Sequence, residues 1–254
     1  MAGRSLMRRI AILAIVCLLL RVPCLAKGEQ LTLFTEEYPP INYSEAGRAS
    51  GLGSAIVSEI MQRAGIQASI EVVPWARGYR TVLSTPNTGL FVTARTPQRE
   101  AAFRWVGPLV RTQGMLYGRR GDFPLIGVLE DAAKVDKLAV PRDWYLQQIL
   151  ENAGFKNLHF VVTPLKALQL LHLGRVALVA IDDVNLEVTA RELSVDASEF
   201  VPLYRVAESH HYLALSLGTP EPVVQACRKA LETMKADGTL AQLYRRWLPG
   251  VAPP

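Results

Sequence analysis

One arginine of this sequence stands where a cation is unfavourable unless an anion binds it. It belongs to the segment Thr93-Ala94-Arg95-Thr96-Pro97-Gln98-Arg99-Glu100, in which Thr96 and Pro97 predict the start of a helix. Arg99 then falls in the first turn, where a cation opposes the helix dipole by roughly 0.3–1 kcal/mol. An arginine beside helix-start amides is a good receptor for a carboxylate. Arg99 is therefore a candidate anion-binding residue, and a solvated surface arginine is the alternative interpretation.

Aromatic side chains follow two predicted strands and are candidate walls of a binding site. Tyr38 follows the strand predicted at 30–35, and Trp75 and Arg77 follow the strand predicted at 69–73. Open α/β sheets bind ligands at the carboxyl ends of their strands. Trp75 and Arg77 could stack on and charge-pair with an anionic or zwitterionic solute. The alternatives are that Trp75 packs in a core and that Tyr38 packs in a turn.

Two carboxylates end a third predicted strand. Residues 176–181 form a continuous apolar run, as expected of a strand buried on both faces, and Asp182 and Asp183 follow it. A carboxylate at this position could meet an ammonium group, or it could cap the following helix. Asp182 is therefore a second candidate site residue, of opposite charge to Arg99.

Other chemical motifs are missing from the sequence. It contains no GxxxxGK[ST] phosphate loop, no GxSxG elbow and no HExxH zinc helix. Gly51-Leu52-Gly53 lacks the third glycine of a dinucleotide motif and indicates a turn before a helix. His210 and His211 are adjacent and point in different directions, which favours a surface or hinge pair over a metal site. We predict no metal and no cofactor, because the chain has only four histidines and few cysteines.

The N-terminus has the features of an export signal. Its first 26 residues contain four arginines and no acid. Arg4, Arg8 and Arg9 precede the apolar run 10–20, Arg21 follows it, and Cys24-Leu25-Ala26 then offers a cleavage site before Lys27. Eleven apolar residues are too few to cross a bilayer as a helix. Without the signal, 24 Lys and Arg balance 23 Asp and Glu, so binding to nucleic acid is not implied. We expect cleavage, export to the periplasm, and one remaining cysteine, Cys227, buried in a helix.

The rest of the chain alternates strands with helices and predicts an α/β fold. The pattern runs from residue 30 to residue 94 and restarts after Gly121. Two such units without a flexible linker predict two lobes joined by tight crossings, with a cleft between them. Besides the strands already named, strands are predicted at 90–94, 138–140, 159–163 and 212–217, and helices at 54–64, 76–84, 145–153, 164–173, 223–235 and 240–247.

The chain resembles the extracellular solute-binding proteins of the polar-amino-acid type (solute-binding family 3), the receptors of ABC importers, as a divergent subgroup. The matching segments are TEEYPPINY, RTPQREAAFRWVGPLV, LAVPRDWYLQQIL, GRVALVAIDD and KADGTLAQLYRRWL. The resemblance implies the type II periplasmic binding protein fold, with two parallel or mixed-sheet lobes and two hinge crossings. We expect residues 27–112 plus 212–254 to form lobe 1, and residues 113–211 to form lobe 2.

The resemblance also implies roles for the candidate residues. Arg99 would clamp the ligand α-carboxylate, Asp182 would receive the α-amine, and Tyr38 would stack on the ligand. Where family members have a small hydroxyl residue two before the motif threonine, this chain has Ala94, and Asp143-Trp144 replaces the usual Gly-Ser of the second lobe. The full set of expected ligand-binding residues is Tyr38, Trp75, Arg77, Thr93, Arg99, Tyr145 and Asp182.

We therefore expect a monomeric, non-enzymatic receptor. It would close its lobes on a small carboxylate-bearing solute and deliver the solute to an ABC transporter membrane permease. Two alternatives stay open. One is a dehydratase-like enzyme on the same scaffold, with Glu36, Glu37 or Asp182 as general acid. The other is a sensor that reports ligand occupancy to a membrane kinase or cyclase.

Overall fold

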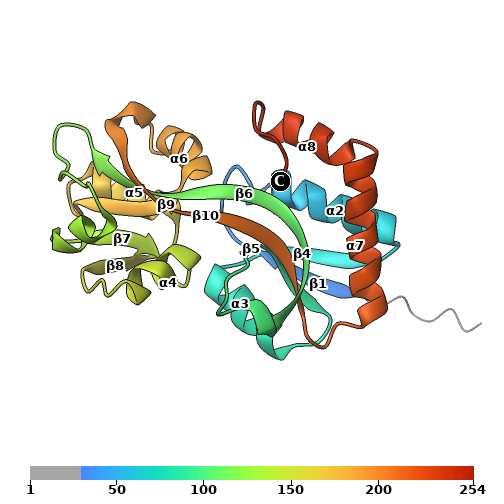
Figure 1. Ribbon diagram of the computed structural model, residues 1–254. Coiled ribbons are helices and arrows are strands. Elements are labelled where there is room, and N and C mark those ends of the chain that lie inside the picture. The colour runs from blue at the N-terminus through green and yellow to red at the C-terminus, as the bar shows by residue number, and fades with distance from the viewer. Residues whose placement is uncertain (1–29) are drawn as a thin grey trace, which may run out of the picture.

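The protein consists of two groups of elements joined by two long strands, as Figure 1 shows for the computed structural model. The structure describes residues 30–254, so the predicted signal peptide lies outside the described residues. We call the group that contains the first strand and the C-terminal helices the first lobe, and the other group the second lobe. The predicted α/β fold with two lobes is confirmed.

A single eight-stranded sheet runs through both lobes in the order β4-β1-β5-β10-β6-β9-β7-β8. The outer strands pair in parallel within each lobe, as βαβ connections require. The central strands β6 and β10 pair antiparallel with each other and pass between the lobes. The bounds are β1 Leu31–Thr35, β4 Ala68–Val72, β5 Thr88–Ala94, β6 Phe103–Arg119, β7 Leu138–Pro141, β8 Leu158–Val161, β9 Leu178–Asp182 and β10 Phe200–Ser216, with a separate hairpin of β2 Tyr43–Glu45 and β3 Arg48–Ser50.

Helices cover the sheet in each lobe. The first lobe carries α2 (Leu52–Ala64), α3 (Trp75–Ser84), α7 (Glu221–Ala236) and α8 (Thr239–Trp247). The second lobe carries α4 (Tyr145–Asn152), α5 (Pro164–His172) and α6 (Leu186–Glu192). Short 3-10 turns lie at 100–102, 129–134, 183–185 and 197–199.

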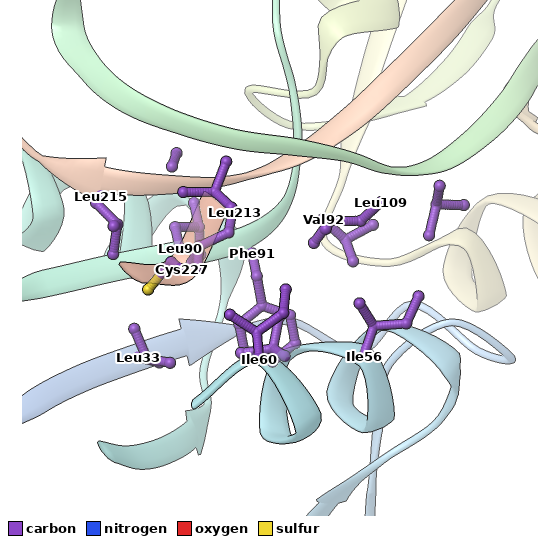
Figure 2. Packing of buried hydrophobic residues seen from close by; sticks show 14 of the residues in the cluster. Leu33, Ile56, Ile60, Leu90, Phe91, Val92, Leu109, Leu213, Leu215 and Cys227 are labelled. Carbon is purple, nitrogen blue, oxygen red and sulfur yellow. The ribbon is translucent and has the colours of Figure 1, made fainter. Parts of the chain in front are cut away.

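The largest apolar core belongs to the first lobe. Ile56 and Ile60 lie one helical turn apart on α2 and belong to the same buried apolar cluster as Phe91 of β5 (Figure 2). Cys227 of α7 has no exposed surface and borders the same cluster, so its predicted burial in a helix is confirmed. This core holds the carboxyl ends of β1 and β5 in fixed positions, and those ends lead into two of the site segments.

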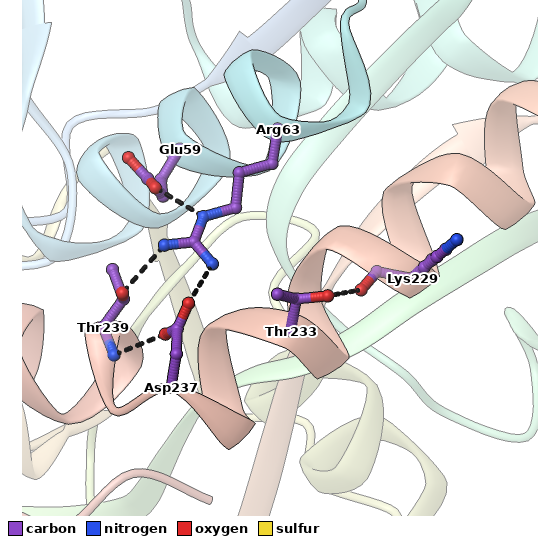
Figure 3. Close-up of polar contacts among 6 residues, drawn as sticks. All are labelled: Glu59, Arg63, Lys229, Thr233, Asp237 and Thr239. Carbon is purple, nitrogen blue, oxygen red and sulfur yellow. Dashed lines mark hydrogen bonds and ion pairs between the residues drawn. The ribbon is translucent and has the colours of Figure 1, made fainter.

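An arginine fastens the helices of the first lobe to one another. Arg63 of α2 contacts Glu59 Oε1 at 2.6 Å and Asp237 Oδ2 at 2.5 Å, and its Nη2 donates to Thr239 Oγ1 at 2.8 Å (Figure 3). Asp237 and Thr239 lie at the junction of α7 and α8. The C-terminal helices, which are distant from α2 in sequence, are therefore tied to it by polar contacts as well as by apolar packing.

Two predictions about the joining segments were wrong or incomplete. Residues 103–119 were not predicted as a strand, and β10 begins at Phe200 instead of residue 212. Gly107 and Pro108 interrupt the strand pattern of β6, and only its pairing with β10 makes the extended conformation evident. The predicted lobe boundaries, 112/113 and 211/212, fall inside these two strands and remain a prediction.

The helix predicted to begin at Thr96 is also wrong. The Arg99 N–H donates to the Thr96 carbonyl at 3.0 Å to close a turn, and a single 3-10 turn at Glu100–Ala102 follows. Because β6 begins at Phe103, no room is left for a helix, and tertiary pairing overrides the local helix-start signal. Arg99 is therefore not at the N-terminus of an α-helix, and its environment comes from other segments.

Candidate functional site

A small cavity lies between the two lobes, at the ends of β1, β5 and β9. Its volume is about 20 Å³, which is room for about one water molecule, whereas pockets for small molecules usually measure ~300–1,000 Å³. Any larger solute must therefore enter while the lobes are further apart. The cavity is lined by Glu36, Tyr38, Trp75, Val92, Ala94, Arg99, Trp144, Tyr145, Asp182 and His211.

Arg99 is a buried cation without an anionic partner among the described residues. Its side chain is 1% exposed, and no carboxylate oxygen of residues 30–254 forms an ion pair with it. The guanidinium lies 4.6 Å from the Trp75 ring centroid, and its Nη2 donates to the Asp143 carbonyl of the second lobe at 2.8 Å. Burial lowers the pKa of Arg99 to about 10, which leaves it charged at neutral pH. Such a buried charge is a receptor for an anion.

The Arg99 guanidinium keeps hydrogen-bond donors that its protein contacts do not use, the Nε N–H among them. Nη1 donates to the Ala94 carbonyl at 3.3 Å, while Nε is buried and has no hydrogen-bond partner in the described part of the chain. Buried donors are usually satisfied, and an unpaired one in a cavity wall is unusual. The free Nε, together with the missing counter-charge, marks Arg99 as the anion-binding group of this cavity.

Asp182 is the carboxylate that faces Arg99 from the second lobe. It ends β9, is 1% exposed, and accepts hydrogen bonds from the hydroxyls of Tyr38 at 2.6 Å and of Tyr145. Burial, reinforced by the charge of Asp182, raises the pKa of both tyrosines well above the usual value, so both are neutral donors. Tyr38 belongs to the first lobe, so its hydrogen bond crosses the cleft.

Glu36 is a second carboxyl group in the cavity wall, directly after β1. Its Oε2 accepts a hydrogen bond from the Trp144 indole N–H at 3.0 Å, a contact that also joins the two lobes. Burial raises the pKa of Glu36 to about 8. The Trp144 hydrogen bond and the charge of Arg99 oppose this shift, and the charge of Asp182 adds to it. Glu36 is therefore mostly protonated at neutral pH.

His211 places a neutral ring where the joining strands meet the cavity. Its Nδ1 lies 3.2 Å from the Val92 carbonyl, which can only accept, so Nδ1 carries the proton. Nε2 then accepts from the Thr112 hydroxyl at 2.8 Å. Burial lowers the pKa of His211 and keeps it neutral. Both histidines of the pair lie in β10; His211 is buried, whereas His210 is partly exposed beside Glu208.

The structure brings five of the seven predicted residues to this cavity: Tyr38, Trp75, Arg99, Tyr145 and Asp182. It does not bring Arg77, which is exposed on α3 because it lies two residues, or about 200°, beyond Trp75. It also turns Thr93 away from the cavity, since its hydroxyl donates to the Leu90 carbonyl at 3.1 Å. The contribution of the five residues to binding remains a prediction.

Five lining residues were not predicted as ligand-binding residues: Glu36, Val92, Ala94, Trp144 and His211. For Glu36 the sequence analysis gives only one role, that of a general acid in the alternative in which the protein is an enzyme. Trp144 carried a usable signal, because the family resemblance implies a small residue at its position. The cavity positions of Val92 and Ala94 depend on the irregular end of β5, where the register with β10 shifts.

Neither a metal cluster nor a membrane helix emerges from residues 30–254. No group of three or more His, Cys, Asp or Glu side chains in this range is placed to hold a metal ion. Within the same range, no helix is both long and apolar enough to cross a bilayer.

The chain is similar in fold to solved structures of binding and sensor proteins. A histidine kinase sensor domain with similarity to periplasmic binding proteins is 22% identical, with a TM-score of 0.81 over 89% of this chain and 99% of that one. A mutant of ArgBP from T. maritima is 15% identical, with a TM-score of 0.76 over 86% and 95%. The arginine-, lysine-, histidine-binding protein ArtJ from Geobacillus stearothermophilus is 14% identical, with a TM-score of 0.76 over 89% and 96%.

Sequence comparison gives the family. No curated protein matches the chain. The model of the bacterial extracellular solute-binding proteins, family 3, matches residues 31–250, which is nearly all of the described chain. This match agrees with the two-lobed fold, with the expectation of a binding protein rather than an enzyme, and with a location outside the cytoplasm. The chain belongs to the bacterial extracellular solute-binding proteins, family 3.

Proposed function

We propose that this protein is a periplasmic receptor that captures a small amino-acid-like solute between its lobes and delivers it to the membrane permease of an ABC importer. The observation that carries the proposal is the buried Arg99 guanidinium, which has no anionic partner in residues 30–254 and shares a cavity with Asp182. A cation in one lobe and a carboxylate in the other are complementary to the two ends of an α-amino acid.

The contacts across the cleft indicate how binding and closure are coupled. The solute carboxylate would take the Arg99 donors, including the Nε that now has no partner in the described chain. The solute ammonium would take the place of the Tyr38 hydroxyl on Asp182. One zwitterion would then contact both lobes. Because these contacts form together only when the lobes are closed, binding would increase the population of the closed form. Trp75 and Tyr38 would supply the aromatic walls.

The family and its neighbours support the same proposal. Family members are solute-binding proteins that act outside the cytoplasm, and one similar structure is described as a substrate-binding protein of an amino acid ABC transporter. A periplasmic receptor needs the predicted signal peptide for export and a permease for delivery. We expect it to act as a monomer, since each chain carries both halves of the cleft.

Thermal unfolding with a panel of amino acids, diacids, amines and sugars tests the proposal. A solute at ~100 times its Kd stabilises by ~2.7 kcal/mol, and a protein of this size gains roughly 2–4 °C per kcal/mol. We expect a Tm increase of several degrees with α-amino acids and no increase for Arg99→Ala. Arg77→Ala is the matched control, because it removes an exposed arginine outside the cavity. Equal shifts in Arg99→Ala and the wild type would refute the site.

A sensor role is a second candidate, because a histidine kinase sensor domain matches with a TM-score of 0.81 over 99% of its chain. Both roles require that the solute binds in the same cavity. They differ in the membrane protein that binds the closed form. Cross-linking in membranes with and without the solute, followed by identification of the partner, separates them. A permease subunit supports delivery, and a kinase or cyclase supports sensing.

A further inference from the structure

The Trp144 side chain of the second lobe fills space between the lobes that a solute side chain would need. We propose that Trp144 limits the size of the solute, so that the cavity selects amino acids with small side chains. This inference rests on the proposed function, because it names the members of the amino-acid class that fit the same cavity.

Trp144 reaches from the second lobe into the first. It directly precedes α4, yet it belongs to the buried apolar cluster of the first lobe and is 5% exposed. Its ring packs edge-on against Tyr38 with 5.1 Å between the centroids, and its indole N–H donates to Glu36 Oε2 at 3.0 Å. The indole is therefore anchored on the first lobe by one apolar and one polar contact.

The turn that carries Trp144 is held by both lobes. Asp143 has a φ of +63°, a left-handed backbone conformation that residues other than glycine adopt infrequently. Its N–H donates to Gln147 Oε1 of the second lobe at 2.6 Å, and its carbonyl accepts from Arg99 Nη2 of the first lobe at 2.8 Å. Because these contacts fix the backbone beside Trp144, any movement of the turn that withdraws the indole would break them.

The space beside the indole is small. The cavity volume is about 20 Å³, which is room for about one water molecule. Arg99 and Asp182 are the groups assigned to the carboxylate and the ammonium of the solute, so the solute side chain must lie against the remaining wall. On the second lobe that wall consists of Trp144 and Tyr145, and the Tyr145 hydroxyl is already bound to Asp182.

A larger solute side chain therefore costs contacts of the closed form. The lobes must move apart to admit any amino acid, and each further solute carbon moves the indole further from Tyr38 and Glu36. A small side chain allows these contacts to form again when the lobes close around the solute. A large one excludes them, so the closed form is populated less.

Isothermal titration calorimetry with uncharged side chains of increasing size tests the inference. The probes are glycine, L-alanine, L-leucine and L-phenylalanine, which share the zwitterionic group and differ in side-chain volume. We expect the wild type to bind L-alanine roughly tenfold or more tightly than L-leucine or L-phenylalanine, since a single methylene can change discrimination by this factor. Trp144→Ala should remove or reverse this preference, and Trp144→Phe should give a ratio between the two.

The ratio of affinities separates size selection from a general loss of closure. Trp144→Ala also removes contacts between the lobes, which lowers the affinity for every probe and leaves the ratio between probes unaffected. Trp247→Ala is the matched control, because it removes a tryptophan of α8 outside the cavity and should keep the wild-type ratio. Thermal unfolding checks that each variant is folded. If Trp144→Ala does not fold, Trp144→Phe, which keeps a ring in the cluster, decides the result.

The outcomes distinguish this inference from the proposed function. An unchanged ratio in the folded Trp144 variants, or a wild type that prefers the larger probes, overturns the role of Trp144. If the wild type binds only larger or charged amino acids and loses this binding in Arg99→Ala, the receptor function stands and this inference falls. If no amino acid binds, both fall.

Discussion

The Tyr38 hydroxyl donates a hydrogen bond of 2.6 Å to the Asp182 carboxylate, and the two residues belong to opposite lobes and are 144 positions apart. In the closed protein, Tyr38 occupies the place on Asp182 that the solute ammonium is proposed to take. The same contact therefore joins the lobes without solute, and under the proposed function the solute would have to displace it.

Tyr38→Phe tests this competition. The substitution removes the hydroxyl and keeps the ring, which packs edge-on against Trp144 at 5.1 Å between centroids. A hydrogen bond to a charged group contributes ~1.5–3 kcal/mol, so we expect the closed form without solute to be less populated. Small-angle X-ray scattering should show a larger radius of gyration without solute, and calorimetry should show equal or tighter amino-acid binding. An unchanged radius together with weaker binding would contradict the competition.

Stability without solute should depend on pH through Glu36. The folded protein holds the Glu36 proton up to about pH 8, whereas the unfolded chain releases it near the ordinary pKa of 4.5. Between these values the folded state binds more protons, so the Glu36 contribution to the free energy of unfolding decreases as pH rises. The decrease is at most ~1.4 kcal/mol per pH unit.

Thermal unfolding of the wild type, Glu36→Gln and Glu37→Gln from pH 5 to pH 8.5 measures this contribution. The Tm of Glu36→Gln should rise relative to that of the wild type as pH increases, while the Tm of Glu37→Gln should follow the wild type. Parallel curves for all three proteins would show that Glu36 is ionised in the folded state.

Gly114 of β6 allows Tyr145 to reach Asp182. A Cβ at residue 114 would lie 2.4 Å from Leu146 Cδ2 and 2.7 Å from the Tyr145 hydroxyl, and both distances are too short. Gly114→Ala should therefore destabilise by ~1–3 kcal/mol and weaken amino-acid binding by displacing Tyr145. Urea denaturation and calorimetry measure the two effects. Gly127→Ala is the control, because its nearest neighbour would be 3.7 Å away; equal effects at both positions would rule out this steric role.

The Arg63 contacts should affect stability and leave binding unchanged. Arg63→Ala removes contacts to Glu59, Asp237 and Thr239 that tie α2 to the α7–α8 junction (Figure 3). We expect a lower Tm at pH 7 and the same amino-acid affinity. The hydrogen bonds of Asp237 to Thr239 and Arg63 lower the pKa of Asp237 to about 2. Part of the stabilisation should therefore be lost as pH falls from about 4 towards 2.

A single hydroxyl in α7 provides the control for Arg63. Thr233 donates to the Lys229 carbonyl of its own helix at 2.9 Å (Figure 3). Thr233→Ala should change the Tm less than Arg63→Ala does. A Tm for Arg63→Ala equal to that of the wild type would mean that apolar packing alone holds the C-terminal helices in place.

Local patterns in the sequence determined most of the secondary structure. Apolar spacing predicted α2, α3, α4, α5, α7 and α8 to within a few residues, because each of these helices buries one face against the rest of its lobe. The same patterns pointed to Tyr38, Trp75 and Asp182, because each follows a strand whose end lies at the ligand-binding edge of a parallel sheet. These features depend on neighbours in sequence and can be predicted from sequence.

Other features of the fold and of the cavity depend on contacts between residues that are distant in sequence, so only the tertiary structure determines them. It replaced the predicted helix at Thr96 by a turn because β6 had to begin at Phe103 to pair with β10. It placed Glu36 against Trp144, 108 positions away. Burial there raises the pKa of the Glu36 carboxyl to about 8, so this carboxyl is mostly protonated at neutral pH. It brought His211 into the cavity wall. Burial and charge pairing across a cleft are set by the closure of two lobes, and no local pattern encodes the distance between them.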